Sequence, residues 1–259
     1  MRYVGRWAVV LWLLWFGWVV AEPLSLLADR LHVQVQATDA PVHVQTHFGT
    51  ITGEVPRVDQ VQRFTSLLSD EFGLYPASLL QASHLQGIVL CHHLAFAGQT
   101  RQAVPDFQHH VLYLEADPGD RLSYYQRLTI HHEFFHVVDN EQDTLYRDEA
   151  WMKLNPPGFE YGLGGKSFRD GEAGDFHPFG FISTYAQSAP EEDKAETFAY
   201  LMVRYGTIMR RAVRDPVLAA KVAAMKSRLQ QLAPQMDDSY WYRLARTPVV
   251  ITQGSRRWP

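Results

Sequence analysis

The sequence predicts an α+β fold. Residues 31–115 hold short runs with β-type alternation, whereas most of residues 123–233 has the spacing of amphipathic helices. Strands that come first and helices that follow are typical of an α+β domain, in contrast to the alternating units of a parallel α/β sheet. A length of 259 residues, with 46% hydrophobic and 20% charged residues, fits one large globular domain or two small ones.

The composition excludes two classes of protein. A net charge of -4 provides no basic surface for nucleic acid. The single cysteine, Cys91, excludes an internal disulfide framework and a zinc site built from cysteines. The 12 histidines are numerous and give the first indication of metal or acid–base chemistry.

The first 21 residues have the pattern of a secretory signal. Arg2 and Arg6 precede an apolar run over 7–20, and small residues lead to an expected cleavage after Ala21. The run is shorter than the roughly 20 residues of a membrane-spanning helix. The alternative is an uncleaved anchor over 7–21, which its four tryptophans favour. Either way, we expect the remaining chain to be extracytoplasmic, that is secreted or periplasmic.

The region 22–54 is expected to form N-terminal strands. Its loose alternation predicts two strands around a turn over 38–41, with the apolar positions Val33, Val35, Val42, Val44 and Phe48. From residue 55 onward we expect a second region that carries the chemistry. Its expected elements are a helix over 57–72, strands over 87–95 and 110–115, a helix over 123–140, and helices that begin near Pro190 and Pro216.

A long irregular loop over 140–190 separates the expected helix over 123–140 from the helix that begins near Pro190. It is rich in glycine, proline and aromatic residues. Loops of this length are usually functional or disordered, so we expect it to influence the site.

The chemistry is carried by an H-E-x-x-H pattern inside an expected helix. Because residues four apart share one helical face, His132 and His136 can direct both imidazoles at one ion. Imidazole nitrogens suit zinc, and a catalytic zinc site combines three protein ligands with a water. Glu133 is placed to hold that water as a general base.

The third ligand is expected from a downstream segment. Where metzincins carry a glycine and a third histidine, this chain has Asp139 and Gln142. Glu192 and Glu196 share a face of a later expected helix, so one can bind the metal and the other can accept a hydrogen bond from a ligand histidine. Glu191 is the alternative ligand.

These motifs resemble the catalytic domain of anthrax lethal factor and the secreted Pro-Pro endopeptidases, which are gluzincin-type zinc metallopeptidases. The likeness rests on H-E-F-F-H-x-x-D and on a tyrosine seven residues before a glutamate that is followed by a second glutamate four residues later. The resemblance implies a zincin-like fold, in which a small mixed sheet is followed by an active-site helix and C-terminal helices. It also implies one Zn²⁺ per chain, with these residues: ligands His132, His136 and Glu192, base Glu133, oxyanion donor Tyr185, and Glu196 behind a ligand histidine.

The surroundings of the motifs allow more than one interpretation. Asp139 either accepts a hydrogen bond near the metal or is a solvated acid. His131 points about 100° away from His132 and is expected to flank the site. We interpret Asp193 and Lys194, which differ from the bulkier residues of the resembled family, as surface variation.

The sequence therefore predicts zinc-dependent hydrolysis of peptide bonds by a secreted or membrane-tethered endopeptidase. Its partners would be peptide or protein substrates, without nucleic acid, and with a membrane only through an uncleaved N-terminal anchor. One alternative is a catalytically silent zincin-fold module that binds a peptide or a partner. Another is a zinc hydrolase of a non-peptide amide.

Overall fold

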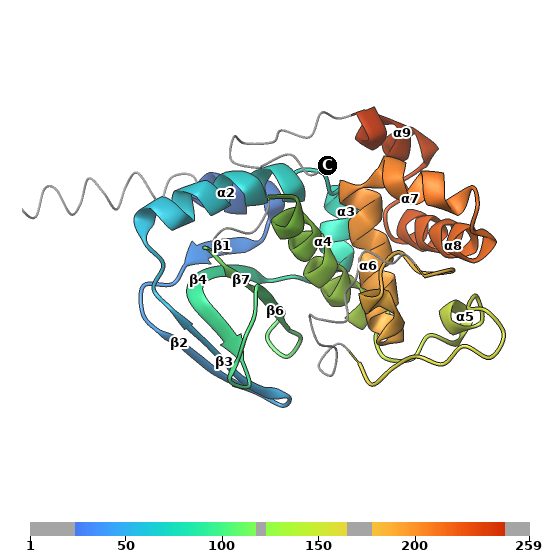
Figure 1. Ribbon diagram of the computed structural model, residues 1–259. Helices are drawn as coiled ribbons and strands as arrows, with labels where there is room; N and C mark the ends of the chain where they lie inside the picture. Colours follow the sequence, from blue (N-terminus) through green and yellow to red (C-terminus); the bar gives the residue numbers. More distant parts are fainter. Residues whose placement is uncertain (1–23, 118–122, 165–177, 247–259) are drawn as a thin grey trace, which may run out of the picture. The chain divides into compact units, whose positions relative to one another are not determined.

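The computed structural model describes residues 24–117, 123–164 and 178–246 (Figure 1). It confirms the α+β class. The chain divides into two compact units, here named the sheet unit and the helical unit. The sheet unit combines residues up to Leu74 with Gln86–Pro118, and the helical unit combines Tyr75–Leu85 with the chain from Gly119 onward.

The sheet unit is built around one long central strand, β4 (Gly87–Phe96). The first half of β4 pairs in parallel with β1 on one side and with β7 on the other, and its second half pairs antiparallel with β3 and β5. The strand order along the main path is β2-β3-β4-β7-β6. The other strands are β1 (Gln34–Ala37), β2 (Val42–Thr46), β3 (Gly49–Glu54), β5 (Gln99–Thr100), β6 (Ala103–Asp106) and β7 (Val111–Glu115).

The parallel half of β4 forms the core of this unit. All of its first five residues, Gly87 to Cys91, are buried, as expected for a strand covered on both faces. Helix α2 (Val58–Phe72) adds a stripe with helical spacing, formed by Val61, Phe64, Leu68 and Phe72. The single cysteine lies within this core, and burial, followed by the charge of Glu115, raises the pKa of Cys91 to about 12.

The N-terminal strands pair differently from the expectation. The segment 38–41 does not close a hairpin, because β1 pairs in parallel with β4 while β2 pairs with β3. The hairpin turn lies instead between Thr46 and Gly49, where the Thr46 hydroxyl donates to the Gly49 carbonyl at 2.7 Å. Residues 24–31, also expected within a strand region, are helical.

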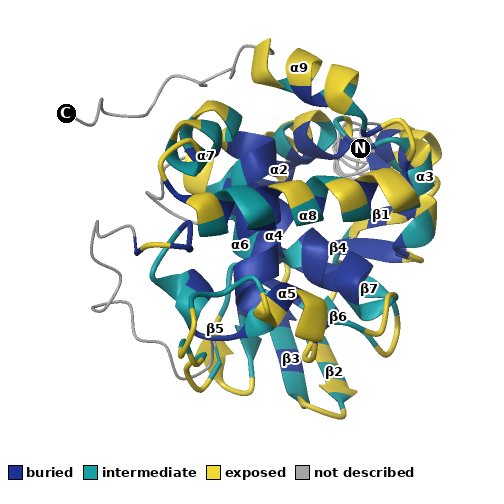
Figure 2. Ribbon diagram, turned by 90° about the vertical axis from the view of Figure 1, so that its right-hand side faces the viewer, coloured by how far each residue is buried: buried dark blue, intermediate teal, exposed yellow. Residues whose placement is uncertain are grey.

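The helical unit is centred on two long helices that lie side by side, α4 (Ser123–Asn140) and α6 (Pro190–Val203) (Figures 1 and 2). The expected helix over 123–140 has these exact bounds. The remaining elements are α3 (Ala77–Ala82), α5 (Glu149–Met152), the 3-10 turn η3 (Tyr185–Gln187), α7 (Tyr205–Ala212), α8 (Pro216–Leu232) and α9 (Asp238–Arg246).

Both predicted proline starts are confirmed. Pro190 and Pro216 occupy the first turns of α6 and α8, where the missing N–H costs nothing. Asp215 caps α8 by accepting a hydrogen bond from the Leu218 N–H at 2.9 Å. Helix α6 ends at Val203, and α7 begins after a single intervening residue.

Two predicted segments fall outside this description. The signal or anchor over 1–21 lies outside the described residues, as does the part of the long loop over 165–177. Among the residues that are described, no helix has the length and apolarity needed to cross a membrane.

Candidate metal centre

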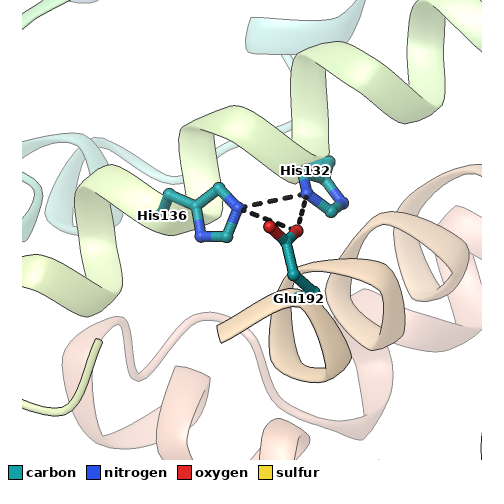
Figure 3. A group of neighbouring side chains, drawn as sticks. All are labelled: His132, His136 and Glu192. Atoms are coloured by element: carbon teal, nitrogen blue, oxygen red, sulfur yellow. Dashed lines mark hydrogen bonds and ion pairs between the residues drawn. The ribbon is translucent and has the colours of Figure 1, made fainter. Parts of the chain in front are cut away.

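The two histidines of the H-E-x-x-H pattern lie on α4 and face the first turn of α6 (Figure 3). His132 and His136 bring their Nε2 atoms to 3.1 Å from each other. Glu192 Oε2 lies 2.9 Å from His132 Nε2 and 3.5 Å from His136 Nε2. In the described part of the chain, these three form the one group of metal-binding side chains whose ligand atoms converge in this way.

The arrangement fits a zinc ion. Zinc binds nitrogen and oxygen ligands at about 2.0–2.2 Å, which separates tetrahedral ligand atoms by about 3.3 Å. The three separations, 3.1, 2.9 and 3.5 Å, bracket that value. Two imidazoles and a carboxylate are also the donor set of catalytic zinc sites that leave one position for water.

The hydrogen bonding behind His132 strengthens the case for a cation. Its Nδ1 lies 3.1 Å from Glu196 Oε1, and the other carboxylate oxygen of Glu196 accepts from the Ser183 hydroxyl at 2.6 Å. A carboxylate can only accept, so His132 Nδ1 carries the hydrogen and a neutral ring has its Nε2 lone pair free. That lone pair then faces the lone pairs of Glu192, which is stable only around a positive charge.

Without a metal, a proton supplies that charge. Burial alone would lower the pKa of His132, but hydrogen bonds to Glu192 and Glu196 raise it well above its usual range. Burial would likewise raise the pKa of Glu192, but hydrogen bonds from His132 and His136 hold it below its usual range. The pocket is therefore electrostatically prepared for a cation, and a divalent metal would replace the proton.

Tyr185 and Glu133 border the same site. The Tyr185 ring, in η3, has its centroid 5.8 Å from that of His132. Burial, followed by the charges of Glu192 and Glu133, raises the pKa of Tyr185, so its hydroxyl keeps its proton at neutral pH. Glu133, on α4, is half-buried. The structure thus brings together every residue to which the resemblance assigns a role.

Other candidates lie outside the cluster. Glu191 is not part of the converging group. His131 is fully buried and bonds through Nδ1 to the Tyr75 hydroxyl, in keeping with a flanking role. Asp139 is buried and contacts Lys194, Arg228 and Thr144 rather than a ligand histidine.

The interpretation of Asp193 and Lys194 as surface variation is wrong. Both side chains are 0% exposed. Asp193 accepts from Trp151 Nε1 and pairs with Lys221, while Lys194 pairs with Asp139. The one available signal was Lys221, which falls on the apolar stripe of α8 between Leu218 and Val222 and so indicates a buried ionic partner.

The sequence analysis also did not identify Ser183, whose hydroxyl donates a hydrogen bond to Glu196. Nothing in its spacing from Glu196 marks it, because it lies in irregular chain before η3.

Comparisons with known proteins agree with this site. A family model described as "Putative zinc-binding metallo-peptidase" matches residues 103–233. The crystal structure of a putative zinc-binding metallo-peptidase from Bacteroides caccae superposes with a TM-score of 0.55 at 19% identity, over 89% of this chain and 90% of that chain, a likeness of fold. No curated protein matches the sequence. Because the family match spans just over half of the chain and includes all three converging side chains, the protein belongs to the family of putative zinc-binding metallo-peptidases.

Proposed function

We propose that the protein is a zinc-dependent endopeptidase that hydrolyses peptide or protein substrates outside the cytoplasm. The observation that carries the proposal is the convergence of His132, His136 and Glu192. The hydroxyl of Tyr185, which keeps its proton, and the carboxylate of Glu133 border the same point. A metal store would need the ligands but not these two neighbours.

Glu133, Tyr185 and Glu196 each have a specific role in the proposed hydrolysis of peptide bonds. When bound, zinc supplies Lewis-acid polarisation of a carbonyl and lowers the pKa of water. Glu133 accepts the proton of the attacking water and passes it to the departing amine nitrogen. Tyr185, which keeps its proton, donates a hydrogen bond to the oxyanion that develops on the scissile carbonyl. Glu196 holds the His132 ring in the tautomer that presents Nε2.

A gluzincin-type arrangement, similar to anthrax lethal factor and the Pro-Pro endopeptidases, is the subclass we propose. It is supported by the positions of Tyr185, Glu192 and Glu196, whose sequence spacing follows that pattern and whose side chains gather around His132. The proposed location, secreted or periplasmic with a possible anchor over 7–21, rests on the N-terminal sequence. We propose no nucleic-acid partner, in line with the net charge of -4.

The test pairs metal content with cleavage. We expect one zinc per chain in the purified protein and cleavage of members of a peptide library. Glu133→Gln should retain the zinc and lose cleavage, because the base is replaced by an amide of the same shape. Glu149→Gln, an exposed carboxylate of the same unit, is the matched control and should leave both unchanged.

Each contrary result has a distinct meaning. Full cleavage by Glu133→Gln would contradict the proposed mechanism. Tight peptide binding without product, in both the unmodified protein and Glu133→Gln, would favour the silent binding module. Turnover confined to non-peptide amides would favour the third alternative.

A further inference from the structure

Two buried lysines and their acidic partners surround the turn of α6 that carries Glu192. Lys194 and Lys221 are both 0% exposed. Lys194 Nζ lies 2.6 Å from Asp139 Oδ2, and Lys221 Nζ lies 2.7 Å from Asp193 Oδ2. A buried ion pair costs substantial desolvation and is weak evidence for stability, so these pairs call for another explanation.

The two pairs join α6 to different partners. Lys194 is two residues past Glu192, and Asp139 is three residues past His136 on α4. Their ion pair therefore connects the same two helices that the candidate ligands connect, about half a turn past Glu192 on α6 and just under one turn past His136 on α4. Lys221 belongs to α8, and its pair with Asp193 connects α6 to α8 instead.

The Lys194 ammonium has several partners at the end of α4 and in the loop that follows it. Besides Asp139, it donates to the backbone carbonyl of Thr144 at 2.6 Å and approaches that of Leu145 at 3.5 Å. Asp139 is held in turn by Arg228 Nη1 at 3.3 Å and by the Thr144 hydroxyl at 2.7 Å. An ammonium that is paired with a carboxylate of α4 and donates to a carbonyl of the following loop has few alternative positions, which holds α6 against the end of α4.

We propose that Lys194 and Asp139 are positioning residues that set the distance between Glu192 and the two histidines, and so determine the zinc affinity. A metal site needs its ligands held to about 0.5 Å by the surrounding structure. The ligand separations of 2.9–3.5 Å match those of a zinc site. The Lys194–Asp139 pair joins the two helices that carry these ligands through side chains that are not ligands themselves.

The inference rests on the proposed zinc site, and a matched pair of variants tests it. Lys194→Met breaks the link between α4 and α6 but leaves Asp139 paired with Arg228. Lys221→Met breaks an equally buried pair on the same helix turn but leaves that link intact, with Asp193 still bonded to Trp151 and Tyr161. Each substitution removes one buried ammonium, so both should lower the melting temperature of the metal-free protein.

Zinc affinity separates positioning from plain stability. We would measure the dissociation constant for Zn²⁺ by chelator competition on the full chain, well below both melting temperatures. Supporting residues of metal sites typically change affinity 10–100-fold, so we expect Lys194→Met to weaken zinc binding by about 10-fold or more. Lys221→Met should stay within about 3-fold of the unmodified protein.

Asp139→Asn removes the same link from the other side and provides the comparison if Lys194→Met does not fold. It should weaken zinc binding in the same direction. Equal dissociation constants for the link-breaking and control variants would overturn the inference while leaving the zinc site intact. Absence of zinc binding in the unmodified protein would overturn the proposed function and the inference together.

Discussion

Two substitutions of Glu196 test how far its hydrogen bond to His132 contributes to zinc affinity. Its carboxylate accepts from His132 Nδ1 at 3.1 Å and from the Ser183 hydroxyl at 2.6 Å, and its side chain is 14% exposed. Glu196→Gln keeps a carbonyl acceptor for His132 but loses the charge, and its amide nitrogen would donate to the Ser183 hydroxyl instead of accepting from it. Glu196→Ala loses the acceptor as well.

The magnitudes follow from the type of hydrogen bond. A bond to a charged group contributes about 1.5–3 kcal/mol and a neutral one about 0.5–1.5 kcal/mol, so the glutamine variant should lose about 1 kcal/mol, or about 5-fold in zinc affinity. Glu196→Ala frees the imidazole to rotate, and we expect a loss of 10–100-fold, or about 1.4–2.7 kcal/mol. The assay is chelator competition for Zn²⁺ at fixed pH.

Ser183 provides the internal control. Ser183→Ala should weaken zinc binding in the unmodified background, because Glu196 loses the partner that orients it. In the Glu196→Ala background the same change should have no further effect, since residues in one network couple. An unchanged dissociation constant for Glu196→Ala, or independent effects of the two alanine changes, would refute the reasoning.

Three further predictions follow. Tyr185→Phe should lower kcat for a peptide substrate by about 100–1000-fold while zinc content stays at the unmodified level; an unchanged kcat would remove Tyr185 from the mechanism. Zinc at 100 times its dissociation constant should stabilise the fold by about 2.7 kcal/mol; thermal unfolding with and without chelator should show this difference in the unmodified protein and lose it in His132→Ala. Burial would raise the pKa of Asp148, but the Arg228 guanidinium holds it below its usual value. The stability from this pair is therefore present above the unfolded pKa and is lost as the pH falls through the folded pKa. Asp148→Asn should flatten the acid side of a melting-temperature profile; an unchanged slope would contradict this.

The helices could be predicted because their signals are local. The bounds of α4 and the starts of α6 and α8 follow from apolar spacing and from prolines at first-turn positions. The partner of β1 could not be predicted in this way. Alternation places Val35 on a buried face whether the strand pairs with its neighbour or with β4, about 50 residues away, and only the tertiary fold selects between them.

In the candidate site, too, features with a local sequence signal could be predicted, and features that depend on distant partners could not. Helical spacing identified His132 and His136 as residues that share a face, and the resemblance selected Glu192 among the glutamates of the later helix. The burial of Asp193 and Lys194 depends on partners in α8 and at the end of α4, which no local pattern connects to them. From the sequence alone, the charged residues after Glu192 look like the solvated first turn of a helix. Only the tertiary structure shows the buried partners of Asp193 and Lys194.

The first turn of α6 explains why polar residues are retained in so buried a position. Glu192, Asp193, Lys194 and Ala195 are four consecutive buried residues, and successive helical side chains point about 100° apart, so the turn is enclosed on every side. Apolar residues of similar volume would often give equal or greater stability. They would not define the rotation of the helix, because apolar contacts have no direction. Here Glu192 points to the imidazoles of α4, Asp193 to Lys221, and Lys194 to Asp139. Any rotation of α6 that withdrew Glu192 from the histidines would also draw Lys194 away from Asp139, so the geometry of the metal ligands is tied to the ion pair that joins α6 to α4.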